Sequence, residues 1–482
     1  MNNKNKLTTM KTLSISLIGL AIGTTSSAQE VQGLFGETVP GLTAAENVRF
    51  VEGRDEFNEI LTAAAGLGPI FNDSSCGQCH STPVAGGFSD KKVDRAGIAG
   101  PPFDPLAALG GSLFQQQSIE PPVSVINPNT GVGFVAGDCL ETIPVQATVT
   151  AKRLTPPTFG AGLVQSIDDN DILFYQNNPP SGFVAGIARP TNPFEGGSRL
   201  GKFGWKGGVA TMLTFSADAS LNEMGLTNRF IGSENAPNGD AVLLAACDQA
   251  SDPEDFPDGI TGLERIDRQQ DFQIFLSAPA QTPKSGMSGE TVFNTIGCAD
   301  CHVGQAYTTM STGVLSPALA NKEIKPYSDF LLHDMGALGD GIVDGIATEQ
   351  LMKTSPLWGL WPRAAVSLLH DGSATGGSEV ANITAAIQAH DGEAATSVGN
   401  FNGLSQPDID AMMVFLRSLG SSEFDFERNN NRDQFDWFFM HTLFTGPGGS
   451  LTPDDDAAIS DANQDGSFDM GDYSVFMRAF TG

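Results

Sequence analysis

The sequence predicts a mainly α-helical protein, and three observations lead to this prediction. Several short stretches, such as residues 407–419, space their apolar residues as one face of a helix. Two pentapeptides of the form C-x-x-C-H divide the chain into two parts. Two further stretches, residues 425–446 and 461–482, repeat each other near the C-terminus and predict a small helical module of their own.

The two pentapeptides are Cys76 to His80 (CGQCH) and Cys298 to His302 (CADCH). C-x-x-C-H is the attachment signature of a c-type haem, in which both thiols form thioethers and the His becomes the proximal iron ligand. A redox dithiol or half of a zinc site is the alternative, but zinc needs more Cys or His nearby. We therefore predict two covalently bound haem c groups, with haem-binding residues Cys76, Cys79, His80, Cys298, Cys301 and His302.

The motifs predict two cytochrome c-like haem domains, over residues 49–284 and 285–422. Residues 57–67 have helical spacing and lead into the first motif, and a short helix starting at about Ser288 leads into the second. Between the motifs lies a Gly/Pro-rich region with an apparent strand and turn over residues 122–134. This stretch predicts a β-containing insertion in the first domain.

The N-terminus reads as a secretory signal. Residues 1–28 combine lysines, a short apolar run and small residues at the expected cleavage site, and residues 29–48 read as a linker. The alternative is an anchor that stays attached to the protein. No other apolar run is long enough to span a membrane. We expect a periplasmic or secreted protein, which suits haem c attachment outside the cytoplasm.

Two cysteines, Cys139 and Cys247, remain after haem attachment, and an even pair in an oxidising compartment predicts a disulfide. The alternative is two separate buried thiols. The chain holds 56 acidic and 26 basic residues, a formal charge of −30. This balance argues against nucleic acid and anionic membranes as partners, and it permits calcium sites and a basic redox protein as electron donor or acceptor.

The C-terminal repeats, within residues 425–482, space oxygen ligands as an EF-hand calcium loop does. The second copy offers Asp461, Asn463, Asp465, Asp469 and Asp472, and the first, weaker copy offers Asp425, Glu427, Asn429, Asp433 and Asp436. Asp at the last position resembles paired dockerin-type loops, so we predict a dockerin-like calcium-binding module with a cohesin-like partner. The alternative is an acidic, disordered tail.

The distal ligand decides what each haem can do, because an open position lets small molecules bind the iron. The remaining histidines are His333, His370, His390 and His441, and none lies between the motifs. The first haem therefore has no distal His from its own region. Met212 and Met224 could serve, although a Met at helical spacing is more often a core residue.

Several stretches together resemble a known family: GLGPIFNDSSCGQCH, RLTPPTFGAGLVQSI, GKFGWKGGVATMLTFSADASLNEMGLTN, PYSDFLLHDMG, SPLWGLWPRAAVSLLHDGSA and AIQAHDGEA. Over about residues 45–420 the chain is similar to the bacterial di-haem cytochrome c peroxidase superfamily, and in particular to its branch of di-haem oxidoreductases. In the peroxidases a Met ligates the second haem. The equivalent position here is His390, so the resemblance implies a His302/His390 haem with a lower potential than a His/Met haem.

These observations predict an exported di-haem oxidoreductase that relays electrons from the bis-His second haem to a reactive first haem, where peroxide is the simplest oxidant. Peroxide reduction needs an acid–base group near the iron. Glu223 is the candidate, and the alternative is a surface glutamate on a helix. The competing function is a non-catalytic electron-transfer cytochrome with two six-coordinate haems.

Overall fold

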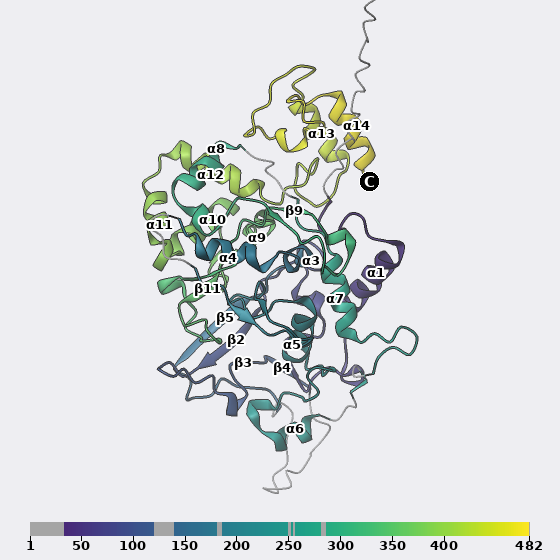
Figure 1. Ribbon diagram of the computed structural model, residues 1–482, viewed down its shortest axis with the longest axis vertical. Coiled ribbons are helices and arrows are strands. Elements are labelled where there is room, and N and C mark those ends of the chain that lie inside the picture. The colour runs from purple at the N-terminus through teal and green to yellow at the C-terminus, as the bar shows by residue number, and fades with distance from the viewer. Residues whose placement is uncertain are drawn as a thin grey trace, which may run out of the picture. The chain divides into compact units, whose positions relative to one another are not determined.

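The computed structural model describes residues 33–119, 139–180, 186–248, 252–253, 256–280 and 286–481. The predicted signal peptide (1–28) and the predicted strand and turn (122–134) lie outside these residues. Within the described ranges the fold is mainly helical with short antiparallel strands, as the sequence predicts (Figure 1). None of the helices described is both long and apolar enough to cross a membrane.

The helices fall into three groups along the chain. The first group is α1 (Ala44–Asn58), α2 (Cys76–Cys79), α3 (Ala161–Gln165), α4 (Asp169–Asn177), α5 (Met212–Met224), α6 (Ala241–Cys247) and α7 (Arg265–Phe275). The second is α8 (Ser288–Thr295), α9 (Leu360–Ala364), α10 (Glu379–Ala389), α11 (Ala395–Asn402) and α12 (Gln406–Ser418). The third is α13 (Gln434–Leu443) and α14 (Met470–Ala479).

The strands are short and pair locally. They are β1 (Ile70–Phe71), β2 (Lys92–Gly97), β3 (Leu113–Phe114), β4 (Gln117–Ser118), β5 (Val149–Leu154), β6 (Pro190–Thr191), β7 (Arg199–Leu200), β8 (Tyr307–Thr308), β9 (Glu323–Ile324), β10 (Leu332–Asp334), β11 (Leu351–Lys353), β12 (Ser367–Leu368) and β13 (Ala374–Thr375). One sheet has three strands in the order β3-β2-β5, and β2 pairs with β5 from Lys92 opposite Leu154 to Gly97 opposite Val149. The region after the first motif therefore contains strands, although the predicted stretch 122–134 is not among the described residues.

Helices α1 and α7 cross closely because Gly53 has no side chain. A Cβ on Gly53 would lie 2.3 Å from the carbonyl oxygen of Arg268. Next to the crossing, the rings of Phe57 and Phe272 lie 4.9 Å apart, and Phe57 lies 5.8 Å from the ring of His80. The crossing thus places a buried aromatic ring against the proximal histidine of the first motif.

Helices α8 and α12 repeat this arrangement around the second motif. A Cβ on Gly289 would lie 2.0 Å from the carbonyl oxygen of Ala411. The rings of Phe293 and Phe415 lie 5.4 Å apart, and Phe293 lies 6.5 Å from the ring of His302. Figure 1 shows α8 beside α12. In both regions a glycine allows two helices to cross, and the phenylalanine four residues later contacts the haem-motif histidine.

Two local expectations differ from the structure. The helix predicted over residues 57–67 is instead α1, which is capped by Thr43 and ends at Asn58. Leu61 and Leu67 beyond it are buried in a cluster with Phe71, so tertiary packing outweighs their helical spacing. The predicted linker (29–48) is also different, because Phe35 is buried and α1 begins at Ala44.

The C-terminal repeats form one small core. Phe424, Phe468 and Phe476 are fully buried in it. Helices α13 and α14 begin in the same way, since Asp433 and Asp469 each cap a helix in a capping box with the aspartate three residues later. The described part of the tail is therefore folded, unlike the disordered alternative.

Candidate di-haem site

Each C-x-x-C-H motif forms a single tight turn. The first is α2, where the side chain of Ser75 accepts a hydrogen bond from the backbone N–H of Gln78. The second is a 3₁₀ turn over Cys298–Asp300, which starts after Gly297 at φ 93°. A short turn of this kind sets two thiols near each other and directs the following histidine to the same side, which thioether attachment to one porphyrin requires.

Both proximal histidines are held in the tautomer that iron needs. His80 Nδ1 lies 3.0 Å from the carbonyl oxygen of Gly87, and His302 Nδ1 lies 3.0 Å from that of Tyr327. A carbonyl can only accept, so Nδ1 donates in each case and Nε2 keeps its lone pair. Burial lowers the pKa of both imidazoles to about 4, which keeps them neutral. The histidines therefore fit haem iron.

The four motif thiols are unpaired with one another and protonated. Burial raises the pKa of Cys76, Cys79 and Cys298 to about 12, and it also raises that of Cys301. A raised pKa disfavours the thiolate that a redox dithiol uses. Cys139 and Cys247, by contrast, form a disulfide, with Cα atoms 6.0 Å apart.

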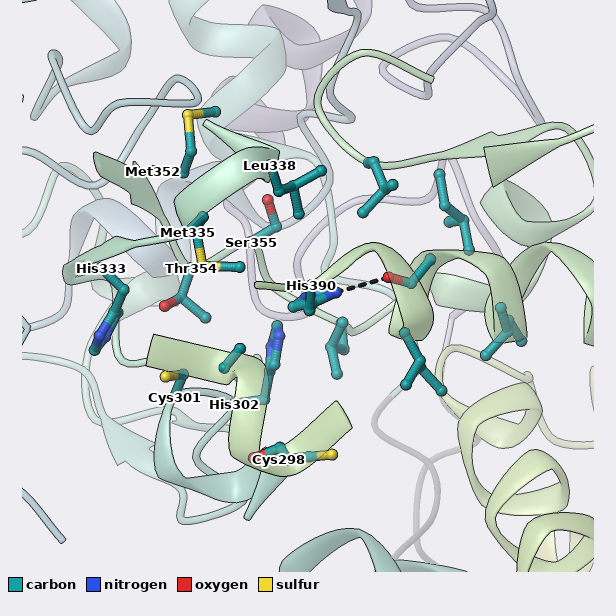
Figure 2. Close-up of a pocket in the computed structure, with 18 of the residues that line it drawn as sticks. Cys298, Cys301, His302, His333, Met335, Leu338, Met352, Thr354, Ser355 and His390 are labelled. Carbon is teal, nitrogen blue, oxygen red and sulfur yellow. Dashed lines mark hydrogen bonds between the residues drawn. The ribbon is translucent and has the colours of Figure 1, made fainter. Parts of the chain in front are cut away.

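The second motif opens into a cavity of about 200 Å³. Its lining is apolar apart from a few groups, and it includes His302, His390 and Met335. Figure 2 shows the imidazole of His302 directed toward that of His390, which lies just beyond the C-terminal end of α10. His390 Nδ1 donates to the carbonyl oxygen of Ala386 at 2.7 Å, and burial lowers the pKa of His390. His390 is therefore neutral and presents Nε2, as a distal ligand must.

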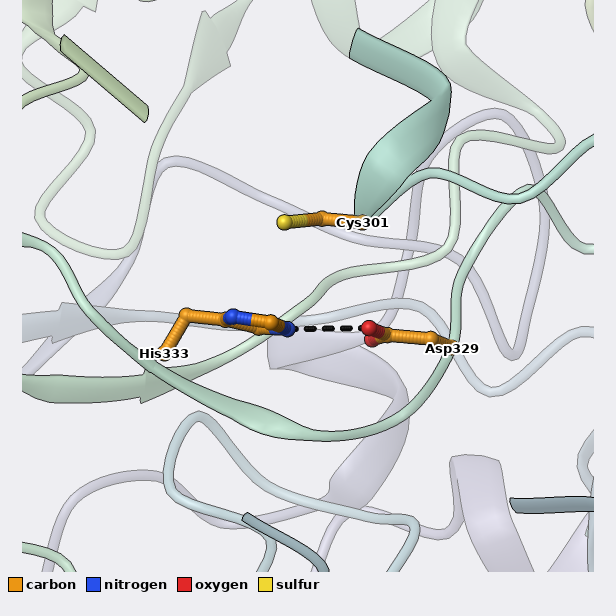
Figure 3. Close-up of side chains that lie close together, drawn as sticks. All are labelled: Cys301, Asp329 and His333. Carbon is orange, nitrogen blue, oxygen red and sulfur yellow. Dashed lines mark hydrogen bonds and ion pairs between the residues drawn. The ribbon is translucent and has the colours of Figure 1, made fainter. Parts of the chain in front are cut away.

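His333 lines the same cavity but cannot act as a ligand in this arrangement. Its Nε2 lies 2.9 Å from Asp329 Oδ2, and its Nδ1 lies 2.7 Å from Glu393 Oε2, so carboxylates occupy both nitrogens. Burial lowers the pKa of His333, but the bonds to Asp329, Cys301 and Glu393 outweigh it and raise the pKa to about 12. Figure 3 shows the ring bonded to Asp329, with the Cys301 side chain beside the pair. His333 is a buried imidazolium.

The loop that carries His390 is fastened through this imidazolium. Glu393 accepts from His333 and also from the backbone N–H of Asp334 at 3.1 Å. Asp391 accepts from the backbone N–H of Ala337 at 2.9 Å. The segment just after His390 is therefore tied to β10 and the turn that follows it, which fixes the orientation of the histidine.

The first motif opens into a larger cavity, of about 500 Å³. His80 is the one histidine in its lining, so the expectation that this site lacks a distal His agrees with the placement of all six histidines. Met212 and Met224, at the two ends of α5, both line the cavity and are both buried. Each is therefore a core residue that also borders the cavity.

Glu223 lies inside this cavity rather than on the surface of α5, contrary to the surface alternative. Its Oε2 accepts a hydrogen bond from Asn72 Nδ2 at 2.7 Å. Burial raises the pKa of Glu223, while the Asn72 bond and the charge of Arg95 oppose that shift. A carboxyl group with a raised pKa holds its proton to a higher pH than a free carboxyl group does, which suits a general acid–base.

A few residues line both cavities: Trp205, Lys353, Ser355 and Arg363. Trp205 is fixed by a hydrogen bond from its Nε1 to the carbonyl oxygen of Leu154 at 2.8 Å, and its ring centroid lies 6.2 Å from that of His370. His370 lines the second cavity and is buried, in keeping with a role near the haem edge.

His441 lies outside both cavities. Its ring packs on that of Trp437 in the tail, with ring centroids 4.2 Å apart.

The two predicted calcium loops share one geometry. At the first position, Asp425 accepts from the backbone N–H of Asn430 at 3.1 Å, and Asp461 accepts from that of Gly466 at 3.0 Å. Asn430 and Gly466 have φ of 62° and 80°, the tight turn that the sequence predicts. In the second loop, Oδ1 of Asp461 is buried and has no hydrogen-bond partner among the described residues.

Carboxylate oxygens also converge in the first loop, although the sequence makes it the weaker candidate. Those of Glu427, Asp433 and Asp436 all lie within 4.8 Å of one another. Convergent carboxylates and an unpaired buried oxygen are what a calcium ion would satisfy. The donor set of both loops fits calcium.

Sequence reasoning did not identify two polar residues of the site, Lys353 and Arg363, nor the contact of His333 with Glu393. A signal was present for Arg363, which is the one charged residue in the apolar run from Leu357 to Leu369. The contact of His333 with Glu393 joins residues 60 positions apart, and no local pattern reveals such a pair.

Comparison with known proteins identifies the family of this chain. A family model described as "Di-haem oxidoreductase, putative peroxidase" matches residues 143–419, which include the second motif and His390 but begin after the first motif. No curated protein matches the chain. Because the family match covers more than half of the 482 residues, and two haem motifs open into adjoining cavities, the chain belongs to the di-haem oxidoreductase family.

Proposed function

We propose that this protein is an exported c-type di-haem oxidoreductase that reduces peroxide at the first haem with electrons received through the second. The observation that carries the proposal is the pairing of two C-x-x-C-H motifs with two cavities that differ in their distal groups. The haems, when bound, supply the redox chemistry, and the chain holds and orients them. Cys76, Cys79, Cys298 and Cys301 would form the thioethers, and His80 and His302 would be the proximal ligands.

The repeated glycine crossings support two cytochrome c-like haem domains. Helix α7 closes the first arrangement at Phe275, and α12 closes the second at Ser418. These helix ends support the proposed domains over residues 49–284 and 285–422, with α1 at Ala44–Asn58 as the start of the first. We therefore place the start of the first domain at α1.

The two haems would have different roles because their surroundings differ. His390 is neutral, oriented and in the same cavity as His302, which favours a six-coordinate second haem suited to electron transfer. The first cavity is larger, and the soft distal ligands among its lining residues are the thioether sulfurs of Met212 and Met224. A weak or displaceable ligand there leaves room for a small oxidant.

Glu223 would hold and move the proton that peroxide cleavage requires. It faces the first cavity, and its orientation is fixed by Asn72 on the segment that leads to the motif. Its backbone carbonyl also accepts from the N–H of Asn72 at 2.7 Å. These two bonds keep the carboxyl group at a constant position relative to His80, as a general acid–base requires.

Trp205 is the group best placed to assist electron transfer between the sites, because it lines both cavities. Its indole is held by Leu154 and contacts His370. An aromatic ring in contact with both sites shortens the distance that the protein must bridge without a redox group.

The N-terminal signal, the disulfide and the tail support an exported protein. A disulfide between Cys139 and Cys247 persists in an oxidising compartment such as the periplasm. The tail would bind calcium in both loops and serve as an attachment module for a cohesin-like partner. The acidic surface would suit a basic redox protein as the electron donor.

The test is electron paramagnetic resonance of the ferric holoprotein, with and without cyanide, together with peroxide consumption by the reduced protein. We expect one low-spin haem that ignores cyanide and one haem whose signal cyanide converts to low-spin. Two low-spin haems that ignore both cyanide and peroxide would overturn the proposal and establish the electron-carrier alternative.

A further inference from the structure

The wall between the two cavities contains two buried cations. Lys353 ends β11 and Arg363 lies in α9, and both side chains line both cavities. Each residue is 7% exposed. We call these two residues the cationic partition.

Arg363 has no partner within the part of the chain that the structure describes. No carboxylate, carbonyl or aromatic ring among those residues pairs with its guanidinium, and burial alone lowers its pKa to about 10. Other buried cations nearby are paired: Lys202 with Asp169 at 2.6 Å, and Lys206 with Asp340 at 3.0 Å. A buried arginine is costly unless it is paired, so Arg363 is an exception that needs an explanation.

Lys353 is nearly as isolated. Its Nζ donates to the carbonyl oxygen of Thr354 at 3.0 Å and lies 5.6 Å from the centre of the Phe330 ring, but it forms no ion pair with a described residue. Burial lowers its pKa to about 8; the charge of Asp329 opposes that shift and the charge of Arg363 adds to it. Two neighbouring cations therefore repel each other inside a protein whose formal charge is −30.

None of the described residues supplies an anion to Arg363, and both cations line the two cavities, so a group bound in these cavities would supply it. A haem carries two propionate carboxylates, and two haem-motif cavities meet at this wall. We propose that the cationic partition binds propionates of both haems, so that one pair of cations serves both sites. The proposal rests on haem occupying both cavities, and it does not depend on peroxide being the substrate.

A cation that contacts both haems affects both reduction potentials, whereas a cation that contacts one haem affects only that potential. A positive charge stabilises the extra electron of a reduced haem, so its removal lowers the reduction potential of any haem that it contacts. Removing Arg363 should therefore lower the potentials of both haems together. A cation that belonged to one site would change only that haem.

The experiment is a spectroelectrochemical titration of the holoprotein in which both haems are followed separately. The variants are Arg363→Gln and Lys353→Gln, with Arg363→Lys as the charge-conserving variant. Matched controls are Arg229→Gln and Lys152→Gln, which remove exposed cations that line neither cavity. Haem content of each variant is measured by pyridine haemochrome.

We expect Arg363→Gln to lower both potentials by about a tenfold change in the ratio of ferric to ferrous haem, or ~59 mV for a one-electron couple. Arg363→Lys should recover most of the shift, and the controls should leave both potentials unchanged. A shift of one haem alone, or of neither, would overturn the shared partition. If Arg363→Gln loses haem, Lys353→Gln still decides, because it must lower both potentials together or the proposal fails.

Discussion

The two motif regions share a scaffold and differ in what faces the iron. Gly53 with Phe57 beside the first motif corresponds to Gly289 with Phe293 beside the second. The difference lies in the other residues that line each cavity, which are His390 in the second and methionines and Glu223 in the first. Under the proposed function, the helix crossings would position the haems and these other residues would determine their roles.

The largest expected effect concerns His390. We predict that His390→Ala changes the second haem from low-spin to high-spin, because the variant loses the distal imidazole that shares a cavity with His302. The measurement is electron paramagnetic resonance of the ferric protein. His441→Ala, in the exposed part of the tail, is the control and should leave the spectrum unchanged. A low-spin second haem in His390→Ala would point instead to Met335.

The next largest effect is on the rate of peroxide consumption, and it comes from a residue of the first cavity. Glu223→Gln should reduce the rate of peroxide consumption by about 100-fold or more, because a general acid–base contributes roughly that much. The reduction potential of the second haem should not change. Because burial raises the pKa of Glu223, we expect the wild-type rate to depend on pH above the usual range of a carboxyl group, and Glu223→Gln to lose that dependence. A variant with full activity would remove Glu223 from the mechanism.

The shared scaffold can be tested at its two glycines. Gly53→Ala and Gly289→Ala each place a Cβ against a backbone carbonyl, at 2.3 Å and 2.0 Å. Each should lower the free energy of unfolding by about 1–3 kcal/mol, the usual cost of overpacking. Chemical denaturation measures this, and Gly399→Ala in α11, where nothing lies near the added atom, is the matched control. Unequal losses at the two crossings would show that the scaffolds are not equivalent.

A smaller effect on stability is expected from the hydrogen bonds of His333 with Asp329 and Glu393, which lie beside the second cavity. A raised pKa in the folded state stabilises the protein fully below the unfolded pKa of about 6.5, and that stability is lost as the pH rises toward about 12. Glu393→Gln removes one partner of the imidazolium. The difference in unfolding free energy between wild type and Glu393→Gln should therefore be present at neutral pH and shrink at alkaline pH. A constant difference at all pH values would contradict the charge of His333.

Calcium removal should have the smallest effect on either haem. A ligand at a hundred times its Kd stabilises the folded protein by about 2.7 kcal/mol, so chelation should lower the unfolding temperature of the tail. Asp461→Ala and Asp425→Ala test the two loops separately by calorimetry. The optical spectra of both haems should remain unchanged throughout. An altered haem spectrum on chelation would place calcium within the haem region instead.

The local turns of the candidate site could be predicted from sequence because each lies within one short motif. Thioether attachment and calcium loops both require fixed spacing within a few residues, and the helix over 407–419 shows its buried face directly. The start of the first domain could not be predicted in this way. Phe35 is buried by Phe159 and Trp361, which are far away in sequence, so its surroundings were invisible to a local pattern.

The polar residues that act across the fold were missed for the same reason. His333 reads as an ambiguous histidine until Asp329 and Glu393 are seen on both of its nitrogens. Sequence alone does not show that Arg363 and Lys353 are buried without an ion pair among the described residues. Their position along two adjoining cavities appears only in the folded chain. The position of Glu223 on the inner side of α5 likewise depends on its contact with Asn72.

The unpaired cations also bear on how the protein matures. Before haem attachment, a folded chain would have to bury Lys353 and Arg363 without an anion, which favours a loosened wall with both side chains in water. A loosened wall leaves the motif cysteines open to the attachment machinery. Arrival of the cofactors would then complete the fold at its centre, so the apoprotein should be more sensitive to proteases around β11 and α9 than the mature protein.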